Sequence, residues 1–389
     1  MAKIILERGK GRRVEGGHPW IYGNEIGQIE GKPVTGEIVE VYNFKNDFIG
    51  KGYINEQSQI TVRLLTRNKN ETINKDFFRK KLLACKKHRE LLGYNQNYRL
   101  VFGEADFLPA LVIDKLNDVY VLQTVSAGMD AWKKEIAEIL MEDFNATGVY
   151  ERNDVPVRKL EGLEEIKGFL SKPFETKFTI EEEGVKFNVD IAEGQKTGFF
   201  LDQKENRKAI KEIVRDADVL DCFTYTGSFA LFASYYGAKN ITALDISEEA
   251  ITLAKQNAEL NAFTNISFVT GNAFDLMPVW VKENKLFDVV ILDPPAFTKN
   301  RQGIESATKG YKEINLRGMK LVKPGGFLVT FSCSHFMTTE LFSNMIAEAA
   351  HDAGRTIREI QYLTQSKDHP VIWGVDETHY LKGFVLQMV

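Results

Sequence analysis

From residue 219 onward, segments with the pattern of buried strands alternate with segments of helical periodicity. Strands are predicted at 219–223, 241–245, 266–270, 287–292 and 326–332, and helices at 229–236, 247–261, 307–322 and 338–353. A chain that repeats strand and helix in this order forms a parallel sheet with helices on both faces. We therefore expect a doubly wound α/β domain in the second half of the chain.

The remaining length leaves room for two further domains, because 389 residues exceed the size of one ordinary domain. Residues 1–68 contain short β-segments at 38–42, 48–53 and 60–65, which predict a small barrel. Helical spacing at 72–93 and 130–144, with strands at 111–113 and 119–125, predicts a central α+β domain. A strand–turn–strand pattern at 177–191, with Gly184 at the turn, precedes the α/β region. The predicted domains are 1–70, 71–178 and 179–389.

Composition bounds the class of protein. A hydrophobic content of 43% with 27% charged residues is typical of a globular protein. The three cysteines, Cys85, Cys222 and Cys333, are odd in number and far apart, which excludes a disulfide framework and fits a reducing compartment. The N-terminus lacks the apolar stretch of a signal peptide, and no metal-ligand spacing is seen. We expect a cytoplasmic protein without a metal.

Charge is unevenly distributed along the chain. Residues 1–93 hold 18 Lys and Arg against 11 Asp and Glu, an excess of seven positive charges. Because the net charge is −4, the remainder carries an excess of eleven negative charges. A basic front end favours an anionic partner, although a solvated charged surface explains it equally well.

A glycine-rich stretch in the basic region mixes cations with an aromatic residue. This mixture suits contacts to phosphates and stacked bases, so the stretch is a candidate RNA-binding loop. The alternative is a flexible solvated loop with Trp20 in the core. The candidate RNA-binding residues here are Lys10, Arg12, Arg13, His18 and Trp20, with Pro19 beside them.

The α/β region carries the pattern of a cofactor pocket. In such a sheet, ligands bind beyond the carboxyl ends of the strands. The loop 224–228 follows the first strand, and Gly227 there permits close backbone approach to a ligand. Asp245 ends the second strand, where an acidic side chain accepts hydrogen bonds from ribose hydroxyls. Asn272 follows the third strand, near the expected position of an adenine.

Three features favour S-adenosylmethionine over a nicotinamide dinucleotide. The loop is not G-x-G-x-x-G, so the pyrophosphate cradle is missing. Pro324-Gly325-Gly326 makes a tight turn into the fifth strand. The late β-segment 380–388 is suited to antiparallel insertion at the sheet edge, as in methyltransferases of this architecture. An unrelated ligand on the same fold is the alternative.

The candidate reaction centre is Asp293-Pro294-Pro295-Ala296-Phe297, directly after an apolar strand. Asp293 can hold the hydrogen-bonding edge of a base, and Phe297 offers a stacking surface for a flipped base. Cys333 ends the next strand and is a candidate nucleophile, since carbon 5 of cytosine becomes reactive only after thiolate addition at carbon 6. The alternative for Cys333 is a small buried hydrophobe.

These stretches resemble the bacterial large-subunit (23S) ribosomal RNA cytosine-C5 methyltransferases that use S-adenosylmethionine. The resemblance rests on 194–207, 219–229, 293–297 and 331–338, and on 368–372 followed by 380–384. Residues 17–21 and 50–65 resemble the N-terminal PUA domain, an RNA-binding barrel of that family. The resemblance covers essentially the whole chain.

The resemblance implies roles for individual residues. Cys333 matches the nucleophile and Asp293 its catalytic partner, while Pro295 and Phe297 would lie against the RNA. Pro295 stands where related cytosine-C5 enzymes place a second cysteine, so the base that removes the carbon-5 proton is unassigned. Asn272 stands where many relatives have Asp. The implied cofactor-binding residues are Thr197, Phe199, Asp202, Gln203, Asp221, Phe223, Tyr225, Thr226, Gly227, Asp245 and Asn272.

The expected function is methyl transfer to carbon 5 of a cytosine in large-subunit ribosomal RNA or its precursor, through a covalent Cys333 adduct. Two alternatives stay open. One is methylation of a guanine ring nitrogen or amine through Asp293-Pro294-Pro295, and the other is a non-catalytic RNA-binding protein of ribosome assembly. The resemblance also suggests a homodimer. No membrane association is expected, because the longest apolar run, near 229–236, is too short to span a bilayer.

Overall fold

The computed structural model describes residues 1–298 and 300–389. By its internal contacts the chain divides into two compact units. The first comprises residues 1–180, 189–201 and 367–378, and the second comprises residues 181–188, 202–366 and 379–389. The chain therefore passes between the units several times, and its last excursion into the first unit is the segment 367–378.

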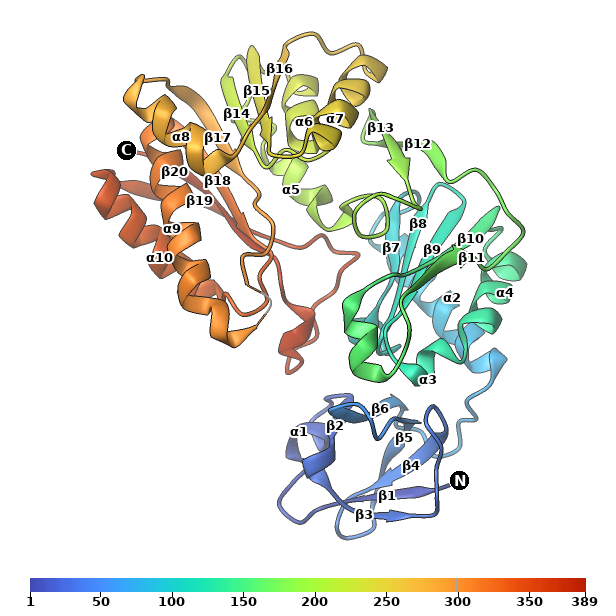
Figure 1. The fold of residues 1–389 in the computed structure, drawn as a ribbon. Helices are drawn as coiled ribbons and strands as arrows, with labels where there is room; N and C mark the ends of the chain where they lie inside the picture. Colours follow the sequence, from blue (N-terminus) through green and yellow to red (C-terminus); the bar gives the residue numbers. More distant parts are fainter. Residues whose placement is uncertain (299) are drawn as a thin grey trace. The chain divides into compact units, whose positions relative to one another are not determined.

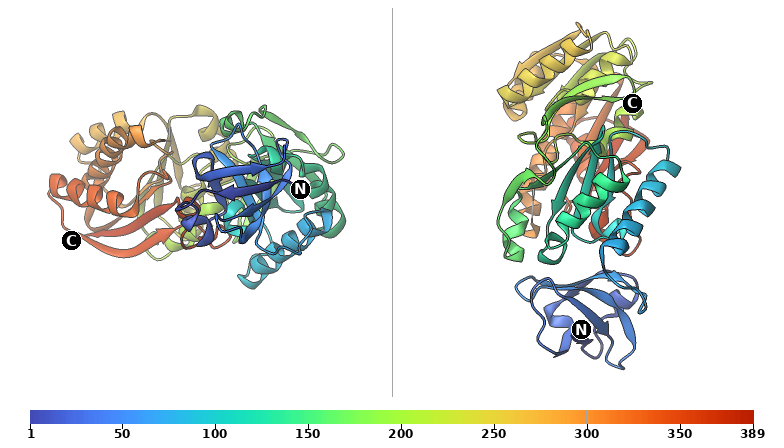
Figure 2. Two further views of the ribbon diagram at one scale, coloured as in Figure 1. Left: turned by 90° about the horizontal axis from the view of Figure 1, so that it is seen from below. Right: turned by 90° about the vertical axis from the view of Figure 1, so that its right-hand side faces the viewer.

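The N-terminal part of the first unit is a small β-domain built on a six-stranded sheet, where the sequence predicts a small barrel from the segments 38–42, 48–53 and 60–65 (Figures 1 and 2). Its core is aliphatic, with Ile4, Val39, Val41 and Val62 fully buried. The strands pair in the order β2-β6-β5-β4-β1-β3. The elements are β1 (Lys3–Leu6), α1 (Arg12–Glu15), β2 (Trp20–Tyr22), β3 (Ile26–Glu30), β4 (Ile38–Tyr42), β5 (Phe48–Ile54) and β6 (Ile60–Thr66).

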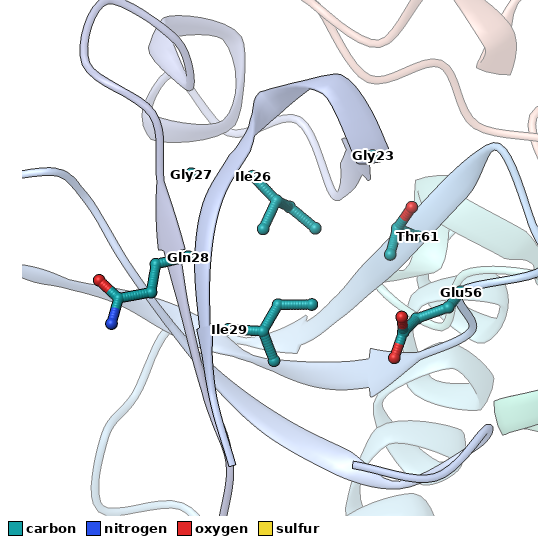
Figure 3. A pocket seen from close by; sticks show the side chains of 7 residues that line it. All are labelled: Gly23, Ile26, Gly27, Gln28, Ile29, Glu56 and Thr61. Carbon is teal, nitrogen blue, oxygen red and sulfur yellow. The ribbon is translucent and has the colours of Figure 1, made fainter. Parts of the chain in front are cut away.

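A hollow of ≈ 340 Å³ lies on the barrel beside β3 (Figure 3). Ile26 and Ile29 point into it from one side, and Thr61 and Glu56 face them from the other. Gln28 points to the opposite side of the strand. Ile26 and Ile29 share a side although they are three positions apart, because the pairing with β1 shifts register between Gln28 and Ile26 and leaves Gly27 as an extra residue. The hollow is lined by Gly23, Ile26, Gly27, Gln28, Ile29, Glu56 and Thr61, none of them a predicted site residue.

The central part of the first unit is a five-stranded sheet in the order β11-β10-β9-β8-β7, with α2 and α4 packed against it. Phe78 and Leu82 of α2 are fully buried, as helical spacing predicts. The elements are α2 (Lys75–Leu91), β7 (Tyr98–Phe102), β8 (Leu111–Leu116), β9 (Val119–Thr124), α3 (Ala127–Asp130), α4 (Lys133–Asp143), β10 (Gly148–Asn153) and β11 (Ile166–Phe169).

The second unit contains a seven-stranded sheet in the order β16-β15-β14-β17-β18-β20-β19. The first five strands of this order pair in parallel, and β20 is antiparallel to both of its neighbours. The hairpin β12 (Lys177–Glu182) and β13 (Val185–Asp190) precedes it, with Gly184 at φ 87 in the turn. The strands are β14 (Asp218–Cys222), β15 (Asn240–Asp245), β16 (Ile266–Thr270), β17 (Phe287–Leu292), β18 (Val322–Ser332), β19 (Ile357–Thr364) and β20 (Lys382–Met388).

Helices cover both faces of this sheet. Leu220, Val290 and Leu328 point to the face covered by α8, α9 and α10, which lie side by side in Figure 1. The other face holds Phe331 against Phe229 of α6. The helices are α5 (Lys204–Ala209), α6 (Ser228–Tyr235), α7 (Glu248–Leu260), α8 (Ala273–Lys282), α9 (Ile304–Leu321) and α10 (Thr339–Ala353). The doubly wound architecture is therefore confirmed.

Three details correct the sequence prediction. The late strand β20 is antiparallel, but it lies second from the edge because β19 pairs outside it. Neither β19 nor α8 was predicted, since β19 has few buried residues and α8 contains Pro278. The turn at 324–326 does not precede β18 but lies within it, where the pairing with β17 shifts register between Phe287 and Val289.

Among the described residues, no helix combines the length and apolar character that crossing a membrane requires.

Candidate active site

The loop after β14 has a tightly determined backbone. Phe223, Tyr225 and Gly227 all have positive φ, at 64, 50 and 86 respectively. At Gly227 an added Cβ would lie 3.2 Å from the Cβ of Ala254 in α7. Glycine is therefore needed for left-handed backbone and for close helix packing, as well as for the approach of a ligand. Gly227 is also the N-cap residue of α6, directly before Ser228.

The side chain of Asp221 holds this loop in place through hydrogen bonds. Its Oδ2 accepts hydrogen bonds from Thr224 Oγ1 at 2.5 Å and from Ala230 N at 3.0 Å, and the side chain is buried. Burial raises the pKa of Asp221 to about 7, and the negative charges of Asp293 and Asp245 raise it further. Three carboxylates therefore lie close enough to influence one another at this edge of the sheet.

Asp245, at the end of β15, holds two segments together. Its Oδ2 accepts from Tyr225 N at 2.9 Å and its Oδ1 accepts from Ser247 N at 2.9 Å. The carboxylate thereby connects the loop after β14 to the start of α7. Each oxygen retains lone-pair capacity for a further donor, so this half-buried group can also bind a ligand hydroxyl.

Asn272 caps α8. Its Oδ1 accepts from Phe274 N at 3.0 Å, so the carbonyl side of the amide serves the helix. An asparagine is sufficient to cap the helix at this position, because the cap needs only one side-chain oxygen as acceptor. The side chain is half-buried, at the carboxyl end of β16.

Asp293 follows β17 and receives a hydrogen bond from a residue distant in sequence. Gln203 Nε2 donates to Asp293 Oδ1 at 3.0 Å, and Asn206 Nδ2 donates to Gln203 Oε1 at 2.6 Å. Gln203 and Asn206 are both buried. Because one end of the Gln203 amide is held by Asn206, its N–H group is directed at the carboxylate. The segment before the main sheet thus positions Asp293.

Asp202 is fixed beside Gln203. Tyr380 OH donates to Asp202 Oδ2 at 2.6 Å, and Ser366 Oγ donates to the carbonyl oxygen of Asp202 at 3.0 Å. Thr197 and Phe199, predicted for the same cofactor segment, belong instead to the first unit. There Thr197 Oγ1 donates to the buried carboxylate of Asp114.

Cys333 lies directly after β18, next to the motif that follows the neighbouring strand β17. Its Sγ is 3.9 Å from the carbonyl oxygen of Pro294, and the side chain is partly exposed. In contrast, Cys85 and Cys222 are buried, and burial raises the pKa of both thiols, that of Cys85 to about 12. Of the three thiols, Cys333 therefore has the accessibility that a nucleophile requires.

Lys382, at the start of β20, lies beneath the loop that carries Cys333. Its Nζ donates to the carbonyl oxygens of Ser334 at 2.7 Å and Met337 at 2.5 Å, and the residue is only 3% exposed. Burial lowers the pKa of Lys382 to about 8, while the charge of the Cys333 thiolate opposes this shift. Sequence reasoning missed this residue because a lysine in a strand gives no local signal of burial.

Phe297 packs on a second buried group. Its ring centroid is 4.5 Å from that of Tyr311 and 5.8 Å from that of Phe274. Tyr311 is fully buried, and its hydroxyl lies 2.9 Å from Ser334 Oγ. Phe297 is therefore held by aromatic contacts close to the Cys333 loop and remains half-buried. Pro295 is exposed.

The predicted RNA-binding loop of the barrel is more ordered than its glycine content suggests. His18 is buried, with Nδ1 2.5 Å from Arg13 Nη1 and Nε2 3.1 Å from Glu377 Oε2. Trp20 Nε1 donates to Glu104 Oε1 at 2.8 Å. The side chains of Arg13, His18 and Trp20 thus make contacts within the protein. Lys10 and Arg12 are exposed.

Comparison with known proteins decides the family. Models of a PUA-like domain and of S-adenosylmethionine-dependent methyltransferases match residues 4–67 and 163–386, and the second match spans more than half of the chain. The chain belongs to the S-adenosylmethionine-dependent methyltransferases. Ribosomal RNA large subunit methyltransferase I of Aliivibrio fischeri strain MJ11 is 41% identical to it over 393 residues, covering 99% of each chain.

Solved structures share the whole fold of this methyltransferase. A protein from Streptococcus mutans, assigned as a SAM-dependent methyltransferase, superposes with a TM-score of 0.84 at 21% identity and covers 100% of both chains. A methyltransferase structure in complex with SAH superposes with a TM-score of 0.86, again at 21% identity and 100% coverage of both. The PUA-like barrel and the doubly wound domain are therefore both confirmed.

One structural feature bears on how the methyltransferase holds its cofactor. Oδ1 of Asp221 is buried and has no hydrogen-bond partner in the described part of the protein. A buried carboxylate oxygen without a donor is costly unless a ligand supplies one. S-adenosylmethionine carries a sulfonium and an ammonium group, so its charge suits the cluster of Asp221, Asp245 and Asp293.

Proposed function

We propose that this methyltransferase transfers a methyl group to carbon 5 of a cytosine in large-subunit ribosomal RNA, through a covalent intermediate on Cys333. The observation that carries the proposal is the position of Cys333 Sγ, 3.9 Å from the carbonyl oxygen that follows Asp293. A thiol and a carboxylate at the ends of adjacent strands can contact the same pyrimidine ring.

The proposed reaction uses two groups of the chain. The Cys333 thiolate adds to carbon 6 of the cytosine, and Asp293 binds the ring-nitrogen side, which favours this addition. S-adenosylmethionine, when bound, supplies an electrophilic methyl group. After methyl transfer to carbon 5, a base removes the proton from that carbon, and the electrons of the C–H bond expel the thiolate from carbon 6. Gln203 supports Asp293 by donating to its Oδ1.

Lys382 supports the same step. Its ammonium group is held by the carbonyls of Ser334 and Met337, one and four residues after Cys333. A buried cation beside a thiol stabilises the thiolate, which is the reactive form. Lys382 therefore both fixes the loop and lowers the free energy of the ionised nucleophile.

The proposed cofactor site consists of the predicted residues of the second unit. Asp221 would meet the positively charged methionine end, and Asp245 would accept from the ribose hydroxyls. Asn272 would lie near adenine with its amide NH₂ group, because its Oδ1 caps α8. The backbone of Phe223, Tyr225, Thr226 and Gly227 would line the methionine end. Asp202 and Gln203 would border the site, while the assignment of Thr197 and Phe199 to the cofactor stays a prediction from the sequence.

The RNA substrate is proposed from two findings. The curated relative from Aliivibrio fischeri is named for the large-subunit ribosomal RNA, and a PUA-like domain occupies residues 4–67. We place the phosphate contacts at the exposed Lys10 and Arg12. Arg13, His18 and Trp20 would shape the loop from within, while Pro295 and Phe297 would lie against the target base. The substrate implies a cytoplasmic enzyme.

The division into 1–70, 71–178 and 179–389 and the homodimer remain predictions.

The test is a covalent trap. The protein is incubated with S-adenosylmethionine and large-subunit ribosomal RNA that contains 5-fluorocytidine, and the products are separated on a denaturing gel. Fluorine at carbon 5 cannot leave as a proton, so the thiol-linked complex persists. The native protein should give a shifted band, Cys333→Ala should give none, and Cys85→Ala, which changes a buried thiol, should retain it.

Two outcomes would refute parts of the proposal. Methyl incorporation into ordinary RNA without a trapped band would favour methylation of a nitrogen and remove Cys333 from the chemistry. Binding of the RNA without any methyl incorporation, and without affinity for S-adenosylmethionine by calorimetry, would indicate a binding protein only.

A further inference from the structure

The segment 367–378 leaves the second unit between β19 and β20 and is anchored in the first unit. Asp368 is fully buried, and its Oδ2 accepts from Arg99 N at 2.8 Å. Arg89, also fully buried, donates from Nη2 to the carbonyl oxygen of Asp368 at 2.9 Å. Asp368 Oδ1 lies 2.9 Å from Nδ1 of the buried His369. The beginning of the segment is therefore rigidly attached.

The segment then forms a tight turn with Trp373 at its tip. Val375 N donates to the carbonyl oxygen of Ile372 at 3.1 Å, and Gly374 has a φ of 85. Thr378 closes the turn, because its Oγ1 accepts from Ile372 N at 3.0 Å and donates to Val375 O at 2.7 Å. The backbone of this turn is thus held from both sides.

Trp373 differs from the other three tryptophans. Its side chain is 96% exposed. Trp20 donates to Glu104, Trp132 packs on Phe78 with ring centroids 4.9 Å apart, and Trp280 is 8% exposed. An indole in water contributes nothing to the core, so fold stability does not explain it. A rigid turn that presents a flat aromatic surface is suited to binding another flat group.

The surroundings of the turn favour RNA as that partner. Glu377 Oε2 contacts His18 Nε2 at 3.1 Å, and His18 contacts Arg13 in the basic barrel loop. The exposed Arg12 adjoins Arg13, the exposed Lys10 lies two residues before Arg12, and residues 1–70 hold 11 Lys and Arg against 8 Asp and Glu. Proteins usually bind single-stranded nucleic acids with two kinds of side chain. Cations contact the phosphate backbone, and aromatic rings stack on the bases.

We propose that Trp373 is a stacking platform for an unpaired base of the RNA substrate, separate from the methylated cytosine. This inference rests on the proposed RNA substrate. The turn and the barrel loop together form one surface, on which Arg12 contacts a phosphate and Trp373 contacts a base. Stacking on an aromatic side chain is independent of sequence, so Trp373 adds affinity and register rather than base identity.

The test compares the binding of large-subunit ribosomal RNA, transcribed in vitro, to the full-length protein and its variants. Trp373→Ala should raise the dissociation constant on the order of ten- to a hundred-fold, and Trp373→Phe should restore most of the affinity. Val371→Ala, which shortens an exposed apolar side chain of the same segment, should bind normally. The salt dependence should be unchanged in Trp373→Ala and flatter in Arg12→Ala, because only the arginine displaces counterions.

The outcomes separate the two proposals. If Trp373→Ala binds the RNA as tightly as the native protein and methylates it, the stacking platform is refuted while the methyltransferase proposal stands. If Trp373→Phe is as weak as Trp373→Ala, the effect is not stacking on an aromatic ring, and the inference also fails. If the native protein neither binds nor methylates the RNA, both proposals are overturned.

Discussion

Asp221→Asn should change how the stability of the second unit depends on pH. The usual pKa of an aspartate is 3.8, and burial raises that of Asp221 to about 7 in the folded protein. Because the folded pKa is above the unfolded one, the stabilising effect of the protonated group is complete below pH 4 and is lost as pH rises to 7. The full difference corresponds to roughly 4 kcal/mol, of which roughly 2–3 kcal/mol is lost between pH 5 and pH 8.

The asparagine does not titrate, so its stability should lack this decline. We expect Asp221→Asn to gain roughly 2–3 kcal/mol relative to the native protein between pH 5 and pH 8. The neighbouring Cys222 is fully buried and reports on the opening of the same strand. The assay is urea unfolding without cofactor, in which a short maleimide pulse labels Cys222 and mass spectrometry gives the labelled fraction.

Asp218→Asn is the matched control on the same strand. Hydrogen bonding from Asn240 and the charge of Lys323 hold the pKa of Asp218 below 3.8. Its contribution to stability is lost only as pH falls through that lower pKa, so Asp218→Asn should show no extra pH dependence between pH 5 and pH 8. Parallel curves for the native protein and Asp221→Asn across this range would mean that Asp221 is ionised throughout, which would refute the reasoning.

Other predictions concern the nucleophile, the cofactor and the loop after β14. Lys382→Met should slow the alkylation of Cys333 by iodoacetamide at pH 7 on the order of ten-fold, about one pKa unit, because the ammonium that favours the thiolate is lost. Asp245→Ala should weaken S-adenosylmethionine binding on the order of ten-fold or more in calorimetry, since it also frees the backbone of the loop. Gly227→Ala should lower the free energy of unfolding by about 1–2 kcal/mol in urea titrations, through a positive φ and a Cβ 3.2 Å from that of Ala254.

Each of these has a specific control. Lys382→Arg retains the charge and should react like the native protein; if it reacts like the methionine variant, the effect is not electrostatic. Asp275→Ala, an exposed acid in α8, should leave cofactor affinity unchanged. Unaltered affinity in Asp245→Ala would remove the ribose assignment. Gly325 has a φ of 81, and an added Cβ there would lie in open space. Gly325→Ala should therefore lower the free energy of unfolding less than Gly227→Ala, and the difference between the two variants gives the cost of the contact with Ala254.

Local pattern predicted much of this protein. The alternation of apolar strands and periodic helices after residue 219 was sufficient for the doubly wound domain, because hydrophobic period and secondary structure are linked within a few residues. Motifs at strand ends, such as Asp245 and Asp293, were predicted to meet because parallel strands bring their carboxyl ends to one edge. The place of Cys333 beside Pro294 follows from the same rule.

Only the tertiary structure decided which distant residues complete the site. Gln203, which the sequence assigns to the cofactor, donates to Asp293 across 90 positions, and Lys382, which the sequence did not single out, reaches the Cys333 loop from a strand that pairs antiparallel with β18. Both are polar residues whose burial depends on long-range packing, so the residues next to them in the sequence do not indicate that they are buried. The excursion that exposes Trp373 is likewise set by Asp368 and its buried partners in the first unit. Sequence thus determined the elements and their order, while pairing and burial determined which side chains act together.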